Sequence, residues 1–213
     1  MARFHTDDAL QKQVRDAVLG PGLYGTYSRE GRYVYIDKGA LASVLQKRFA
    51  VDTVVQGRRG DAVFIEEKIV RWTGRPYTAL TLETKSCTVP GHESEGWMAY
   101  GQADFLNYAM CLADGNVLCR LIDFPKLKAA FWPVEETFRE TISTQHNRTA
   151  CRIVPLRWIA ENVGIHPPAG RLIYACPEGA EIVKQYNGTH YLNAERPQMD
   201  LLAQQEGRAC ADF

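Results

Sequence analysis

The sequence has no surplus of charge of either sign, because 25 lysine and arginine residues balance 25 aspartate and glutamate residues over 213 positions. No field of the whole protein therefore draws it to nucleic acid or to an anionic membrane, and such binding would need a local basic patch. The chain lacks a run of about 18 apolar residues, which argues against a membrane-spanning helix, and its start lacks the apolar stretch of a secretory signal. We therefore expect a cytoplasmic protein with no membrane partner.

Several motifs that would identify a chemistry are also missing. The six cysteines form no CxxC pair, and none lies near a histidine at zinc-site spacing. Scattered cysteines of this kind are typical of small buried side chains in a reducing compartment. The sequence has no glycine-rich phosphate loop and no nucleophile elbow, so it indicates neither a nucleotide-binding fold nor a serine hydrolase.

The composition, with 46% hydrophobic and 23% charged residues, is that of a folded globular protein. The length is sufficient to bury a sizeable core. We expect one α/β domain over residues 1–160, with its core at about 40–132. Residues 161–213 are expected to form a C-terminal extension, either packed on that core or partly ordered.

The spacing of apolar residues predicts a series of helices and strands. Helices are expected at 7–19, ended by Gly20-Pro21-Gly22, and at 40–49, 97–110 and 125–132. Strands are expected at 33–36, 51–55, 62–70, 77–86, 116–122 and, leading into a helical turn, 152–158. From residue 40 the predicted order is therefore helix, strand, strand, strand, helix, strand, followed by a helix.

Two of the expected strands carry charges where a strand normally buries apolar side chains. Glu66 and Lys68 lie in one of them, and Glu83 and Lys85 lie in the next. At positions i and i+2, the carboxylate and the ammonium group point to the same face of a strand. Ordinary cross-strand ion pairs, each worth under about 1 kcal/mol, are the structural alternative.

The turns between the strands predict which charges meet. Folding the chain at Gly57–Gly60 places Asp52 opposite residue 65 or 66. Folding it at Thr73–Pro76 places Glu66 opposite residue 82 or 83. A slip of one residue would change which side chains share a face.

In that register Asp52, Glu66 and Glu83 form a row across three strands, flanked by Lys68 and Lys85. Like charges directly opposed destabilise a sheet, so the row implies a compensating cation. Three carboxylates suit Mg²⁺ or Mn²⁺ bound with water and a substrate phosphate. An adjacent lysine can stabilise a pentavalent phosphate or help to deprotonate the attacking water.

This order of elements, with Asp…Glu-x-Lys in the strands, resembles the core of the PD-(D/E)xK nuclease superfamily, whose fold is restriction-endonuclease-like. A phage and mobile-element branch of it is similar over about residues 40–160, at Gln46–Asp52, Ile65–Arg71, Leu82–Ser86, Gly96–Met98 and Ala103–Tyr108. The resemblance implies an αβββαβ core with a mixed central sheet flanked by helices. It also implies a metal-dependent endonuclease that hydrolyses phosphodiester bonds of DNA.

Carried over residue by residue, the resemblance implies that Asp52, Glu66 and Glu83 bind Mg²⁺ or Mn²⁺. Lys68 would position the attacking water or stabilise the leaving charge. The proline that precedes the aspartate in the family motif is absent, because Val51 precedes Asp52. Some members of the superfamily have lost catalysis, so a catalytically inactive nuclease-like fold that binds DNA or a protein is the alternative function.

A second alignment takes Asp61 as the aspartate and Glu83 with Lys85 as the Glu-x-Lys pair, and the sequence leaves both alignments open. Residues 47–85 contain eight basic and five acidic side chains, a local surplus that contacts with a DNA backbone require. Cutting two strands commonly needs two sites, so a homodimer is compatible with this function. Other candidates near the site, each also explained by a surface or core position, are Gln102, Asp104, His92, Trp97, Tyr100 and Tyr108.

Overall fold

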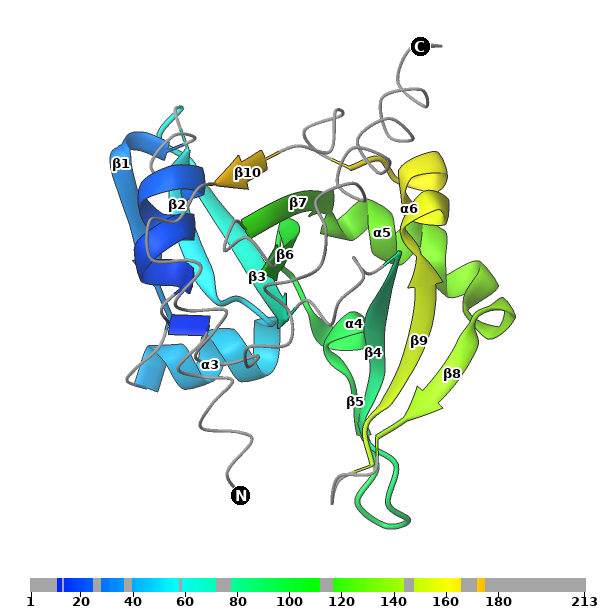
Figure 1. Ribbon diagram of the computed structural model, residues 1–213. Helices are drawn as coiled ribbons and strands as arrows, with labels where there is room; N and C mark the ends of the chain where they lie inside the picture. Colours follow the sequence, from blue (N-terminus) through cyan, green and yellow to red (C-terminus); the bar gives the residue numbers. More distant parts are fainter. Residues whose placement is uncertain are drawn as a thin grey trace, which may run out of the picture.

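The computed structural model describes residues 11–12, 14–24, 28–36, 40–57, 59–71, 78–111, 117–143, 148–165 and 172–174. Within these ranges the chain forms an α/β fold with two β-sheets that lie beside each other (Figure 1). None of the helices in these ranges is long and apolar enough to cross a membrane.

The larger sheet is mixed and has six strands, in the order β1-β2-β3-β6-β7-β10. β3 and β6 are parallel, and every other neighbouring pair is antiparallel. The strands are β1 (Ser28–Tyr35), β2 (Thr53–Gly57), β3 (Ala62–Arg71), β6 (Phe105–Cys111), β7 (Val117–Asp123) and β10 (Leu172–Tyr174).

The smaller sheet is antiparallel and has four strands, in the order β5-β4-β9-β8. These are β4 (Ala79–Cys87), β5 (Ser94–Glu95), β8 (Arg139–Ile142) and β9 (Ala150–Pro155). The helices are η1 (Arg15–Tyr24), α3 (Ala40–Phe49), α4 (Trp97–Tyr100), α5 (Phe124–Phe131), η2 (Trp132–Thr137) and α6 (Leu156–Asn162). In Figure 1, α4 lies between the two sheets.

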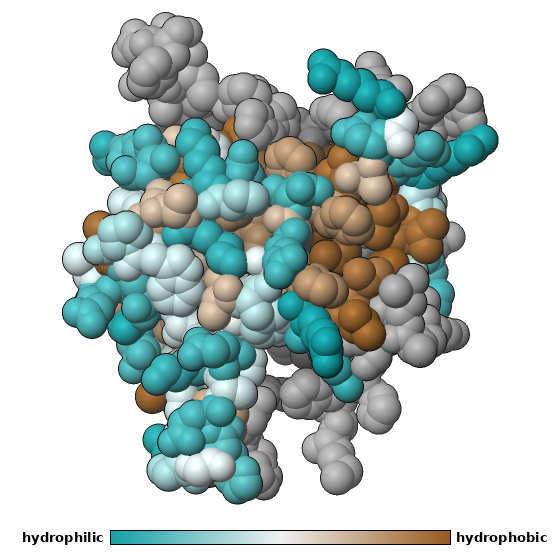
Figure 2. Space-filling model, turned by 180° about the vertical axis from the view of Figure 1, so that it is seen from behind, coloured by the Kyte–Doolittle hydropathy of each residue, from teal (hydrophilic) through white to brown (hydrophobic). Residues whose placement is uncertain are grey.

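Two hydrophobic clusters hold these elements together. One packs η1 on one face of the larger sheet, through side chains such as Leu19 and Leu23 against Val55 and Ile65. The other joins the opposite face of that sheet to the smaller sheet and to α3, α4, α5 and α6. From behind (Figure 2), hydrophilic side chains cover much of the described surface, which also carries a hydrophobic patch.

Several local predictions agree with the structure. The helix expected at 40–49 is α3, and the strand expected at 62–70 is β3. The hairpin between β2 and β3 has the expected register, because Thr53 pairs with Ile65 and the Asp52 N–H donates to the Ile65 carbonyl at 2.9 Å. The remaining strands from 33–36 to 152–158 and the helix at 125–132 are present with shifted ends.

The predicted helix at 97–110 is wrong beyond its first turn. α4 ends at Tyr100, where the Gly101 N–H donates to the Trp97 carbonyl at 2.8 Å, and β6 follows. Nearly every side chain of β6 is buried. A strand that is buried on both faces shows no alternation, so an apolar run of this kind cannot be told from a helix by its periodicity.

The predicted helix end at Gly20-Pro21-Gly22 is also wrong. η1 is a π-helix that continues through Pro21 to Tyr24. Leu19, Leu23 and Tyr24 are almost completely buried against the larger sheet. This tertiary packing outweighs the low helix propensity of glycine and proline.

The predicted pairing of residues 77–86 with the β3 strand is wrong as well. On the side of β3 away from β2 the neighbour is β6, and Glu66 pairs with Leu106. β4 belongs to the other sheet, where Glu83 pairs with Cys151. The turn expected at 73–76 lies outside the described residues. In the predicted C-terminal extension, β10 pairs with β7 and so adds a strand to the larger sheet.

Candidate functional site

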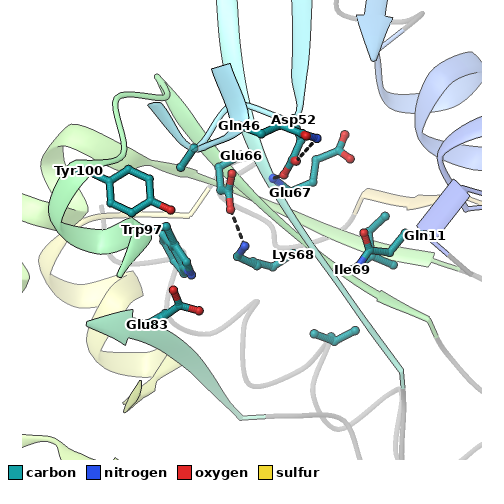
Figure 3. Close-up of a pocket in the computed structure, with 12 residues that line it drawn as sticks. Gln11, Gln46, Asp52, Glu66, Glu67, Lys68, Ile69, Glu83, Trp97 and Tyr100 are labelled. Carbon is teal, nitrogen blue, oxygen red and sulfur yellow. Dashed lines mark hydrogen bonds and ion pairs between the residues drawn. The ribbon is translucent and has the colours of Figure 1, made fainter. Parts of the chain in front are cut away.

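A cavity of about 340 Å³ lies between β3 and the part of the structure formed by β4 and α4 (Figure 3). Four side chains predicted from the sequence line it, namely Asp52, Glu66, Lys68 and Glu83. They meet there although the three-strand row is not formed. Residues that line the cavity with them include Gln11, Gln46, Glu67, Trp97 and Tyr100.

Asp52 is brought to the cavity by a sharp change in chain direction after α3. Ala50 has a φ of 48°, in the left-handed region that few residues other than glycine adopt. Ala50 is buried in the core, and its small side chain packs there with the hydrophobic cluster that includes α3. Asp52 is the last residue before β2 and stands opposite Glu66 of β3.

Three elements hold the Asp52 carboxylate. Gln46 of α3 donates from Nε2 to Oδ1 at 3.3 Å, and the Arg15 Nη2 atom of η1 lies 3.6 Å from the same oxygen. The backbone N–H of Glu67 in β3 donates to Oδ2 at 2.9 Å. Both oxygens therefore have a defined direction before any ligand enters.

Alternation along β3 sends neighbouring side chains to opposite faces. Glu66 and Lys68 share the face toward the smaller sheet, and Glu67 faces η1. The Lys68 ammonium contacts Glu66 Oε1, and it lies 4.8 Å from the centroid of the Trp97 ring. Glu66 is 4% exposed, and its only ion-pair partner among the described residues is Lys68.

Glu67 is enclosed on the η1 side of the sheet, with a side chain that is 0% exposed. Its carboxylate accepts hydrogen bonds from Arg15 Nε, from the Tyr24 hydroxyl and, at 2.9 Å, from Thr53 Oγ1. Asn107 Nδ2 in turn donates to the Tyr24 oxygen at 3.1 Å. Burial raises the pKa of Glu67, and the Arg15 charge and the Tyr24 hydrogen bond oppose that shift.

Arg15 and Tyr24 reach the same carboxylate because η1 is a π-helix. They are nine residues apart, which in an α-helix of 3.6 residues per turn would put them on opposite sides. A helix closed by i→i+5 hydrogen bonds takes more residues per turn, and this brings both side chains toward β3.

Glu83 enters the cavity because α4 packs closely on β4. The Gly96 N–H donates to the Thr84 carbonyl at 2.9 Å, and a Cβ at Gly96 would clash with the carbonyl oxygen of Glu83. The Glu83 carboxylate accepts a hydrogen bond from Ser86 Oγ at 2.5 Å. The glycine before Trp97 is therefore required for this approach, and it places Trp97 and Glu83 on the same side of the cavity.

Burial and like charge perturb the groups in the cavity. Burial raises the pKa of Glu66 to about 7, and Asp52 adds to the rise while Lys68 opposes it. Burial alone would lower the pKa of Lys68, but Glu66 and Asp52 outweigh it and raise that pKa to about 12. Burial and the charge of Glu83 raise the pKa of Tyr100.

The charges around the cavity do not balance. Arg15 contacts both Glu67 and Asp52, and Lys68 contacts Glu66, so the four carboxylates Asp52, Glu66, Glu67 and Glu83 share two cations. Carboxylate oxygens are the donors that Mg²⁺ and Mn²⁺ prefer, so the donor set fits a divalent cation. As the side chains stand, no three His, Cys, Asp or Glu residues in the described ranges are close enough together to hold a metal ion. The Lys68 ammonium contacts one of the two oxygens of Glu66.

The second alignment receives less support from the geometry. Asp61 is exposed in the turn before β3 and does not line the cavity. Lys85 is exposed on β4, where it pairs with Glu95 of β5. Only Glu83 of that alignment reaches the cavity.

Among the other candidates, Gln102, Asp104 and His92 are exposed and do not line the cavity. Tyr108 is buried in the core, whereas Trp97 and Tyr100 line the cavity. The contacts of Gln46, Arg15 and Tyr24 are not predicted by any motif of the sequence. Gln46 lies in one of the segments that carry the resemblance, but no pattern in the sequence links the helix around Arg15 to Glu67.

Comparisons with protein-family models, with curated proteins and with solved structures find no significant match to this chain.

Proposed function

We propose that the protein is a metal-dependent endonuclease that hydrolyses phosphodiester bonds of DNA. Asp52, Glu66 and Glu83 would hold Mg²⁺ or Mn²⁺, and Lys68 would offer a positive charge to the substrate phosphate. The observation that carries the proposal is the convergence of three carboxylates and one lysine on one cavity, from β3, from β4 and from the residue before β2. Together these four groups have a formal charge of about −2, which one divalent cation would neutralise.

The chemistry of the donor set agrees with this reaction. A divalent ion held there would polarise a phosphoryl oxygen and lower the pKa of a bound water. Residues of the chain hold the carboxylate oxygens of the site in fixed directions. Gln46, Arg15 and the Glu67 N–H direct Asp52, and Ser86 directs Glu83. A positive charge at Lys68 suits the charge that develops on the phosphate.

The order of the elements supports a restriction-endonuclease-like core, with a different assignment from the one expected from sequence. η1, β1, β2, β3, α4 and β6 follow each other as helix, strand, strand, strand, helix, strand. Their four strands are consecutive neighbours in the mixed sheet. In this assignment α3 is an insertion between β1 and β2, and β4 with β5 is an insertion between β3 and α4.

DNA as the substrate follows from the resemblance and is compatible with the surface. Lys47, Arg48 and Arg59 are exposed near the ends of α3 and β2, where they are available to phosphate groups. Arg58 and Arg75, which contribute to the local basic surplus, lie outside the residues whose side chains are described.

The test is titration of the purified protein with Mn²⁺ by calorimetry, with plasmid cleavage measured in parallel. We expect the wild type to bind the ion and nick the plasmid, and Glu66→Gln to lose both. Glu136→Gln is the matched control, because Glu136 is an exposed glutamate of η2 outside the cavity. Absence of metal-dependent cleavage by the wild type, or full cleavage by Glu66→Gln, would contradict the proposal.

A catalytically inactive nuclease-like fold that binds DNA or a protein is the second candidate. The contact of Lys68 with Glu66 favours it, since an ammonium group can neutralise part of the buried charge without any metal. It predicts DNA or protein binding that a chelator does not change and no cleavage with Mn²⁺. The plasmid experiment distinguishes the two functions.

A further inference from the structure

The Lys68 ammonium has two neighbours of different kinds. On one side it contacts Oε1 of Glu66, and on the other it lies 4.8 Å from the centroid of the Trp97 ring (Figure 3). A carboxylate attracts an ammonium group by its charge, and an aromatic face attracts it by its quadrupole. Of these two neighbours, only the carboxylate is also a ligand for a divalent cation.

The Trp97 ring is fixed by its surroundings. The residue is 5% exposed, and its ring packs against Phe124 with centroids 5.7 Å apart. Gly96 holds the start of α4 against β4 on the other side. The ring therefore presents a rigid face to the cavity, whereas Lys68 is a flexible chain with a side chain that is 34% exposed.

We propose that Trp97 is the positioning residue for Lys68, holding the ammonium group in the cavity while Glu66 exchanges it for a divalent cation. This inference rests on the proposed function. In the metal-free protein the ammonium occupies the place of the cation at Glu66. When the ion enters, the aromatic face keeps the ammonium beside the site, where a substrate phosphate would lie.

The Lys68 ammonium and the cation compete for the Glu66 carboxylate, and this competition can be tested by measuring metal affinity without measuring cleavage. The ring attracts the ammonium less strongly while the Glu66 carboxylate compensates its charge, and more strongly once the cation has taken that carboxylate. Loss of the Trp97 face therefore costs more free energy in the metal-bound state than in the metal-free state. Loss of the ring should therefore weaken metal binding while Lys68 is present. It should have no such effect once Lys68 is gone, because nothing then competes for the carboxylate.

The experiment is a double-mutant cycle on Mn²⁺ affinity, measured by calorimetry on the full chain. Four proteins are compared: wild type, Trp97→Leu, Lys68→Met and the double variant. We expect Lys68→Met to bind Mn²⁺ more tightly than the wild type. Trp97→Leu should bind about tenfold more weakly than the wild type. In the Lys68→Met background, the same change should leave the affinity unaltered.

A merely structural role for Trp97 would give a different pattern. The affinity would then fall by the same factor in both backgrounds, and this would overturn the inference. If Trp97→Leu does not fold, Trp97→Phe replaces it in the cycle; it keeps an aromatic face, and about a threefold loss is expected in the Lys68 background alone.

The outcomes also separate this inference from the proposed function. Suppose that the wild type binds Mn²⁺ and cleaves DNA, and that Trp97→Leu and Trp97→Phe both bind Mn²⁺ as tightly as the wild type. This result would overturn the role of Trp97 and leave the nuclease proposal standing. A wild type that binds no Mn²⁺ would overturn both.

Discussion

Glu66 and Glu67 are neighbours on β3, and both are almost completely buried, at 4% and 5% exposure. Their surroundings are opposite in kind. Glu67 receives hydrogen bonds from an arginine, a tyrosine and a threonine. Glu66 faces two further acids, Asp52 and Glu83, across a cavity and has one lysine as its ion-pair partner.

The difference teaches how to separate structural from functional acids within one strand. A buried carboxylate whose donors are all supplied by the fold stabilises that fold and has no capacity left for a ligand. A buried carboxylate with too few donors is destabilising on its own, and it is retained where a function needs it. By this criterion Glu67 supports the sheet, and Glu66 belongs to the site.

The largest expected effect is on the Glu67 side. Arg15→Met leaves the enclosed Glu67 carboxylate without its cation, and we expect the free energy of unfolding to fall by about 3–5 kcal/mol. The double variant Arg15→Met/Glu67→Met removes both charges and should recover most of that loss. Urea denaturation of the three proteins measures the effect. A loss below about 1 kcal/mol for Arg15→Met would mean that Glu67 does not depend on this pair.

Lys68→Ala tests the Glu66 side. We expect plasmid cleavage to fall by about 10²–10³-fold, because the positive charge that faces the phosphate is lost. The protein should remain folded, since Lys68 belongs to the partly exposed wall of the cavity. Circular dichroism checks the fold, and Lys126→Ala on the exposed surface of α5 is the matched control. Cleavage at the wild-type rate would exclude the proposed role of Lys68.

The stability of the metal-free protein should depend on pH through Glu66. Its pKa is raised from about 4.5 to about 7, so the folded state binds the proton more tightly than the unfolded state. The stabilisation is complete below about pH 4.5 and is lost as the pH rises to about 7, by up to about 3 kcal/mol.

The titratable side chains that line the cavity with Glu66 are Asp52, Lys68, Glu83 and Tyr100. Denaturation in the presence of a chelator at several pH values measures the slope, and Glu66→Gln should flatten it. Equal slopes in the two proteins would show that Glu66 is not the group that titrates.

The smallest expected effect is that of Asp61→Asn. Asp61 is exposed and lies outside the cavity, so the free energy of unfolding should change by less than about 0.5 kcal/mol. Cleavage should continue at the wild-type rate. Loss of cleavage in this variant, with Asp52→Asn remaining active, would reverse the choice between the two alignments.

The part of the site that is local in sequence could be predicted. Asp52 directly precedes β2 and Glu66 lies on β3, the two strands of one hairpin, and a short turn fixes the register of such a pair. The place of Glu83 could not be predicted in the same way. It depends on β6 lying parallel to β3, and a parallel neighbour is chosen by packing over long distances in the chain rather than by a turn.

Two other features of the structure could not be predicted from the sequence, because they also depend on how the elements pack together. β6 is apolar on both faces, so its pattern resembles that of a buried helix. The contact of Arg15 with Glu67 joins residues 52 positions apart through a π-helix, and neither glycine nor proline in its sequence indicates that geometry. The predicted charged side chains do line the cavity, although the strands that carry them are arranged differently from the predicted sheet.

The parallel arrangement of β3 and β6 has one further consequence. Parallel strands cannot be joined by a tight turn, so the chain between them must form a crossover. Here the crossover includes β4, β5 and α4, and it supplies Glu83, Trp97 and Tyr100 to the cavity. The site is thus divided between two sheets, because this crossover is itself part of the smaller sheet, where β4 pairs with β9 and Leu80 and Leu82 are buried in the core. The distance of Glu83 and Trp97 from Glu66 and Lys68 is therefore set by the packing of one sheet on the other, so a substitution at that packing interface, remote from the cavity, should alter the site without changing any of its residues.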